Sequence, residues 1–253
     1  MENFSLQHWT KEDYNSLILH LKAQADLKYK KFHSGIMPNT AENYIIGVRM
    51  PILRKIAGEI SKGNGRDFLQ FVLDDYYEEA MLYGLVLSKI KTQNYEDFCY
   101  LYDKFVDRIN NWAVCDTCSG KSKDFKKYKE QYFLYLENYI QSDNPWAIRY
   151  AIITMFNYKK DAEYLEVILQ RLNKITNDYY YVKMAKAWLC AELFVFDKER
   201  IYNFLRENNF DKETMLMTFS KLRDSLRVSS DDKEKLKALK NLKFNLTNKD
   251  TLI

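Results

Sequence analysis

The residues with the clearest potential for chemistry lie in one short stretch, Asn110 to Asp116 (NNWAVCD). If this stretch is helical, the Trp112 indole and the Asp116 carboxylate lie one turn apart on the same face. A carboxylate can stabilise positive charge that develops on a substrate, and the face of an indole attracts cations. Two interpretations of this pair are open: a catalytic carboxylate beside an aromatic wall, or a core tryptophan beside a solvated or capping aspartate.

Three further segments carry side chains that are suited to binding. Arg149 lies in the first turns of a predicted helix, where a guanidinium can bind phosphate or form a salt bridge to a neighbouring helix. Tyr181 and Trp188 fall on one face of a later helix, a stripe that suits either a core or a binding surface. The third segment supplies basic residues that suit contact with a DNA backbone or simply end an exposed helix. These residues are Lys221, Arg223 and Arg227.

The cysteines include one C-x-x-C pair, Cys115 and Cys118, among four in the chain. A redox pair normally sits in a βαβ context, and a zinc site needs two more clustered ligands. The sequence shows neither, because its three histidines lie far from this pair. We therefore expect reduced, structural cysteines and no metal or other cofactor.

The composition predicts a folded, helical protein. Of 253 residues 47% are hydrophobic, and only 7 Gly and 3 Pro occur, too few for the many tight turns of a β-rich chain. No secretory signal and no apolar run long enough to cross a membrane is visible, so we expect a cytoplasmic protein.

The net charge of +4 is too small to predict a nucleic-acid partner by itself, but its distribution is uneven. Acidic residues gather at other positions than the basic residues do, for example at Asp74-Asp75 and Glu78-Glu79. We therefore expect one basic and one acidic face. The basic clusters span Lys22 to Lys31, Arg49 to Lys55, Lys121 to Lys129 and Lys221 to Lys243.

Hydrophobic spacing and capping residues predict helices along the whole chain. Thr10 with Asp13, Asn94 and Asn144 are the predicted N-terminal caps, Asn111 is the predicted start of another helix, and 44–51 is briefly strand-like. The predicted helices span 10–32, a segment from Pro51, 67–73, 76–90, 95–109, 111–118, 126–140, 145–158, 161–173, 178–197, 198–207, 212–226 and 231–240.

These helices form antiparallel pairs of about 35 to 45 residues with short connections, which is typical of an α-solenoid such as a HEAT array. We therefore predict an all-α fold, a HEAT-like α-solenoid with a concave basic face, with a globular bundle as the alternative. Residues 1–253 are expected to form a single repeat domain whose tail, 244–253, is irregular.

The order of these motifs resembles a known family. The Trp112-to-Asp116 spacing, a later W-x-x-R ending at Arg149, and an aromatic-rich helix ending in Trp188 follow one another along the chain. In this respect the chain is similar, over about residues 20–240, to the AlkD-type DNA alkylation-repair glycosylases, which are built from HEAT-like repeats. The resemblance implies that Asp116 is the catalytic aspartate and that Trp112 and Trp188 flank the deoxyribose of the lesion.

The resemblance also implies that Arg149 contacts DNA near the lesion and that Tyr29 belongs to the site. The chain departs from the family's best-known members at Asn111, where they carry a second tryptophan, and at Ala113, where they carry an acidic residue.

The function expected from the resemblance is metal-independent hydrolysis of the N-glycosidic bond of cationic N3- or N7-alkylated purines. The expected partner is double-stranded DNA containing alkylated bases, bound by a monomer that is cytoplasmic and associates with the nucleoid. Two alternatives from other classes are a noncatalytic DNA-structure-binding module and a protein-binding HEAT-repeat scaffold.

Overall fold

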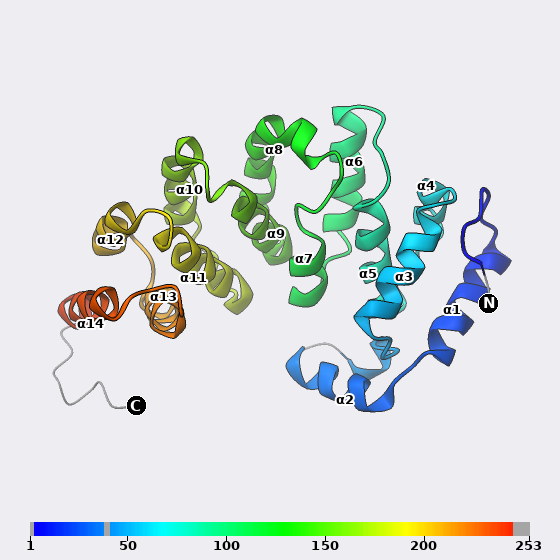
Figure 1. Cartoon of the computed structure of the whole chain (residues 1–253), viewed down its shortest axis with the longest axis horizontal. Helices are drawn as coiled ribbons and strands as arrows, with labels where there is room; N and C mark the ends of the chain where they lie inside the picture. Colours follow the sequence, from blue (N-terminus) through cyan, green and yellow to red (C-terminus); the bar gives the residue numbers. More distant parts are fainter. Residues whose placement is uncertain (1–2, 38–40, 245–253) are drawn as a thin grey trace. The chain divides into compact units, whose positions relative to one another are not determined.

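The computed structural model describes residues 3–37 and 41–244, and these residues form α-helices and two short 3-10 helices without a strand (Figure 1). The all-α prediction is therefore confirmed. No helix in the described ranges combines the length and apolar character needed to cross a membrane. The chain forms two compact units, residues 1–135 and 136–253, and the single-domain expectation stays a prediction.

The first unit is organised around one buried helix, α5 (Tyr77–Leu87), whose residues are all buried. A helix that is buried on every side lies in a core, and α5 packs against α3, α4, α6 and α7. The remaining elements of this unit are α1 (Lys11–Ala23), α2 (Leu27–Ile36), η1 (Glu42–Tyr44), α3 (Met50–Ile60), α4 (Gly65–Leu69), α6 (Tyr95–Val106), α7 (Trp112–Cys118) and most of α8 (Phe125–Ile140).

The second unit is organised around α11 (Tyr180–Phe194), which packs against α9, α12 and α13. In both units alternate helices stack on one another, α3–α5–α7 in the first and α9–α11–α13 in the second. This stacking agrees with the predicted α-solenoid, whereas its concave basic face stays a prediction. The other elements here are α9 (Pro145–Met155), η2 (Phe156–Tyr158), α10 (Ala162–Lys174), α12 (Lys198–Glu207), α13 (Lys212–Asp224) and α14 (Ser230–Phe244).

The predicted helix starts are confirmed where a short polar side chain caps the first turn. Thr10 and Asp13 form a reciprocal capping box at α1. Asn94, Asn111 and Asn144 accept hydrogen bonds from the first turns of α6, α7 and α9. At the other end of the chain, α14 reaches Phe244, beyond the predicted end, and the rest of the tail lies outside the described residues.

The single helix predicted over 10–32 is wrong, because the chain breaks between α1 and α2. The Asp26 side chain caps α2 by accepting from the Tyr29 amide at 3.0 Å, and it pairs with the Arg49 guanidinium at 2.8 Å. The Asp26 amide donates to the Gly47 carbonyl at 3.0 Å. Gly47 has φ +103°, a conformation that favours glycine. A distant loop therefore sets where α2 begins.

The strand-like segment forms no strand and instead binds a buried carboxylate. The amides of Ile46, Gly47 and Val48 donate to the Glu78 carboxylate at 2.9, 2.7 and 3.1 Å. Glu78 and its neighbour Glu79 are both buried, so the prediction that they belong to an acidic solvated face is wrong. Burial is tolerated because each carboxylate has hydrogen-bond donors.

Candidate active site

The α7 helix presents Trp112 and Asp116 one turn apart, as the spacing predicts. Asn111 caps the helix by accepting from the Val114 amide at 2.9 Å. The opposite side of α7 is buried against α5, and a Cβ added at Gly84 would lie 2.5 Å from the Cys118 sulfur. This close packing leaves Trp112 and Asp116 half-buried on the side of the helix that faces away from the core.

The Trp112 ring is held by the end of α2. Its Nε1–H donates to the Ile36 carbonyl oxygen at 3.0 Å, which supplies a donor to one of the last carbonyls of α2. One residue before the cap, Asn110 donates through Nδ2 to the Tyr44 hydroxyl at 3.0 Å. The start of α7 is therefore tied to α2 and to η1 within the first unit.

Tyr29 lies on α2 in the same unit. Its ring stacks on His33 with centroids 5.2 Å apart, and the Arg49 guanidinium lies 5.3 Å from the ring centroid. Burial, together with the nearby Glu78 charge, raises the pKa of Tyr29, so its hydroxyl stays protonated at neutral pH. Tyr29 can thus act as a hydrogen-bond donor.

A cation lies at the C-terminal end of α7. Lys121 Nζ is 3.3 Å from the backbone oxygen of Asp116. A helix C-terminus carries partial negative charge, so a lysine there is favourable. Tyr29, Trp112 and Asp116 all belong to the first unit.

Arg149 lies in the second unit and is only 4% exposed. Its guanidinium donates to the Tyr181 carbonyl oxygen and lies 5.7 Å from the centroid of the Tyr181 ring. The Tyr181 ring in turn stacks on Trp146, with centroids 5.2 Å apart and planes 30° apart. Arg149 therefore joins the first turns of α9 and α11 and holds the half-buried Tyr181 in place.

Trp188 lies further along α11 and is 36% exposed. Its ring packs edge-to-face with Phe156, and the two ring centroids are 4.7 Å apart. One turn later, the Glu192 carboxylate accepts hydrogen bonds from Lys159 at 2.5 Å and from Arg227. Burial alone would raise the pKa of Glu192, but these two cations hold it below its usual value. Trp188 is thus bordered by a compensated carboxylate.

The three basic residues near the end of α13 have different surroundings. Arg227 pairs with Glu192, and Arg223 pairs with Asp224 at 2.9 Å. Lys221 is exposed to solvent. Only exposed or rim charges can exchange their ion pairs for phosphates at low cost, and both arginines are at least half exposed.

With this geometry in place, the comparison with protein families is decisive. The family model described as DNA alkylation repair enzyme matches residues 17–226. This chain belongs to the DNA alkylation repair enzyme family. A search of curated proteins gave no match. Family membership confirms the resemblance inferred from the motifs and supports a DNA repair role with DNA as a partner.

The C-x-x-C pair of this family member belongs to α7. Both sulfurs are buried, Cys115 next to the Ser119 hydroxyl at 3.8 Å and Cys118 next to the Met81 sulfur at 3.9 Å. Burial raises the pKa of Cys118 to about 12, which keeps the thiol protonated. Within residues 3–37 and 41–244, no group of three potential metal ligands gathers. The pair packs α7 onto α5.

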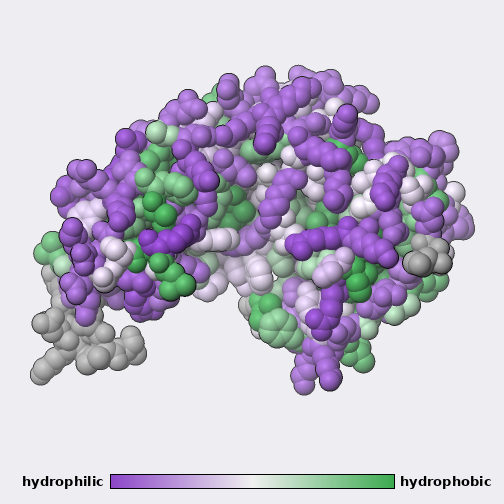
Figure 2. Space-filling model, viewed as in Figure 1, coloured by the Kyte–Doolittle hydropathy of each residue, from purple (hydrophilic) through white to green (hydrophobic). Residues whose placement is uncertain are grey.

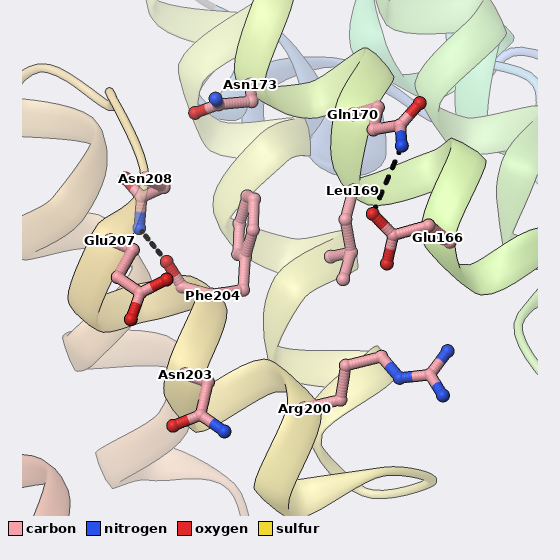
Figure 3. Close-up of a pocket in the computed structure, with 9 residues that line it drawn as sticks. All are labelled: Glu166, Leu169, Gln170, Asn173, Arg200, Asn203, Phe204, Glu207 and Asn208. Atoms are coloured by element: carbon pink, nitrogen blue, oxygen red, sulfur yellow. Dashed lines mark hydrogen bonds between the residues drawn. The ribbon is translucent and has the colours of Figure 1, made fainter.

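The second unit also contains a groove of about 290 Å³ between α10 and α12, drawn in Figure 3. Leu169 and Phe204 supply its apolar surface, and amide, carboxylate and guanidinium groups surround them. No residue that the sequence assigns to the site lines this groove.

Sequence reasoning missed the residues that fix the site rather than those proposed to react. Ile36 acts through its backbone oxygen, which no sequence pattern marks. Tyr44 and Asn110 are separated by 66 residues, and they meet only through the tertiary fold. A signal was available for Asn110 alone, since it precedes the capping residue of α7.

Proposed function

We propose that this protein is a DNA glycosylase that hydrolyses the N-glycosidic bond of N3- or N7-alkylated purines in duplex DNA. The observation that carries the proposal is the outer side of α7, where Trp112 and Asp116 lie together, half-buried and fixed by the contact of the indole with Ile36. Family membership supports a repair role, and the carboxylate beside an aromatic ring supports this particular chemistry.

The chemistry needs little more than a well-placed anion. Alkylation gives the purine a positive charge, so the base departs neutral and the barrier is the oxocarbenium character of the sugar. A carboxylate about 4 Å from that charge attracts it by about 4 kcal/mol at an effective dielectric near 20. If about 3 kcal/mol of this acts only in the transition state, the rate rises on the order of a hundredfold.

The other proposed roles come from the family resemblance. Trp112 and Trp188 flank the deoxyribose, where their faces attract polarised C–H groups. Tyr29 donates a hydrogen bond at the site. Arg149 supports DNA contact near the lesion through Tyr181, since its own guanidinium is almost fully buried.

Three exposed basic residues at and just after the end of α13 bind the DNA backbone in this proposal. They are Lys221, Arg223 and Arg227. We further propose that the enzyme needs no metal, acts as a monomer, and works in the cytoplasm on nucleoid DNA.

The proposal is tested by replacing Asp116 with Asn, which keeps the side-chain shape and removes the charge. Release of 7-methylguanine from methylated duplex DNA should fall about a hundredfold or more, while affinity for the same duplex stays within about twofold. Asp107→Asn, at the exposed C-terminal end of α6, is the matched control and should release base like the wild type. Undiminished release by the Asp116 variant removes this residue from the reaction.

A noncatalytic DNA-binding role is the second candidate. It is favoured by the group of Lys159, Arg227 and Glu192, whose net positive charge suits a phosphate and involves no reactive carboxylate. This role predicts binding that weakens as salt rises, and no base release from methylated DNA by the wild-type protein.

A further inference from the structure

The outer face of α2 combines exposed apolar and basic side chains that the fold does not use. Leu27 is 76% exposed, Phe32 is 63% exposed and Ile36 is 40% exposed. Lys28 and Lys31 are exposed between them. These positions span one half of the helix; the half-buried Tyr29 borders them beside Ile36, and the buried His33 lies on the other half. In Figure 2 hydrophobic and hydrophilic residues lie side by side over α2. We name Leu27, Lys28, Lys31, Phe32, Gly35 and Ile36 the α2 outer face.

The charge of this face is not balanced within α2. The helix contains three lysines and no acidic residue, and its capping Asp26 is already paired with Arg49. Lys28 and Lys31 form no ion pair with a described residue. A helix with exposed aromatic and aliphatic side chains between lysines suits a partner that is anionic and also offers apolar surface.

Gly35 leaves the backbone of α2 uncovered within this face. A Cβ added there would meet no described atom within 4 Å, and its φ is not in the left-handed region. Neither packing nor backbone conformation therefore requires glycine in the last turn of α2. Glycine destabilises a helix relative to other residues, but it also lets another molecule reach the backbone.

The face is joined directly to the candidate active site. Ile36, its last residue, accepts the indole hydrogen bond of Trp112, and both residues belong to the first unit. A partner that covers the α2 outer face therefore also lies beside the residues proposed to surround the lesion.

We propose that the α2 outer face docks on duplex DNA beside the lesion. The choice of DNA over other anionic partners rests on the proposed function. Lys28 and Lys31 contact phosphates, and Phe32 and Ile36 pack against the sugars at the edge of the groove. Gly35 allows the DNA backbone to approach the helix. The face thereby positions the damaged strand against Trp112 and Asp116.

Binding to undamaged duplex DNA tests this inference without requiring catalysis. Lys28→Gln with Lys31→Gln should lower the salt slope of binding by about 1.8, since each lost phosphate contact removes about 0.9. Lys62→Gln with Lys91→Gln removes the same charge from exposed positions outside α2. The salt slope of this control pair should stay steeper than that of the α2 pair by at least about 1. Equal slopes for the two pairs overturn the inference.

Gly35→Gln tests the close approach, and Gly58→Gln in α3 is its control, because a Cβ at Gly58 also meets no described atom within 4 Å. Both variants should unfold at a higher urea concentration, since each replaces a helical glycine. Only Gly35→Gln should weaken duplex binding, by about fivefold or more. Wild-type binding by Gly35→Gln refutes the docking.

Two further readouts separate this inference from the proposed function and from another anionic partner. If the wild-type protein releases no base but the α2 variants lose DNA affinity, the docking holds and glycosylase activity fails. If base is released and the variants bind DNA normally, the docking alone fails. The Phe32→Ser variant distinguishes DNA from an anionic membrane. If this variant no longer binds phosphatidylserine vesicles but binds duplex DNA like the wild type, the partner is an anionic membrane and the inference is overturned.

Discussion

Replacing Glu78 with Gln should loosen the segment that connects the α2 region to α3. One carboxylate oxygen of Glu78 accepts from the Gly47 and Val48 amides, and the other accepts from the Ile46 amide. In glutamine one of these oxygens becomes an NH₂ donor, so at least one buried amide loses its acceptor. A buried unsatisfied donor costs about 1–3 kcal/mol. Alanine would leave three, or about 9 kcal/mol at most, which is comparable with the stability of a whole domain.

Hydrogen exchange of the Ile46 to Val48 amides measures this effect locally, which suits a chain with two compact units. A loss of about 1–3 kcal/mol corresponds to exchange about 5 to 150 times faster. Glu130→Gln, at an exposed position of α8, is the matched control and should not change these rates. If Glu78→Gln leaves exchange at these three amides unchanged, the carboxylate does not hold the segment.

Two further predictions concern ionisation. Arg66 hydrogen bonds hold the pKa of Asp97 below its usual value of 3.8, so their stabilisation is present above that pH and is lost as the pH falls through the lower folded-state pKa. Acid unfolding followed by circular dichroism should therefore show a smaller loss between neutral pH and about pH 3 in Arg66→Gln than in the wild type. Burial raises the pKa of Cys118 to about 12, so mass spectrometry should find it alkylated by iodoacetamide only after unfolding; rapid native labelling would contradict this.

Features that depend on neighbouring residues could be predicted from the sequence. A capping side chain bonds to an amide two or three residues away, so Thr10, Asn94 and Asn111 mark helix starts without any tertiary information. The same locality placed Trp112 and Asp116 on one face, because a single turn of α7 relates them.

Features that depend on distant residues could not be predicted. The break before α2 needs Arg49 and Gly47, which lie more than 20 residues from Asp26. Glu78 reads as a surface acid until the amides of the extended segment from Ile46 to Val48 are known to face it. Likewise, the contact between Trp112 and Ile36 spans 76 residues. The last two join a side chain to a backbone group, and backbone groups are present at every position of a sequence.

Two other tryptophans are followed four residues later by a carboxylate, Trp9 by Asp13 and Trp188 by Glu192. Asp13 belongs to the capping box of α1, and the surroundings of Glu192 show why Asp116 is the better catalytic candidate. Lys159 and Arg227 both donate to Glu192, so this group of three ionised side chains carries a net charge of +1. A cationic sugar brought to Glu192 would meet two positive charges for one negative charge, and the combined field would oppose its formation. The same positive group suits a phosphate. Under the proposed function, Lys159 and Arg227 therefore bind a phosphate of the DNA backbone while Trp188 contacts the deoxyribose, and the reactive carboxylate is Asp116.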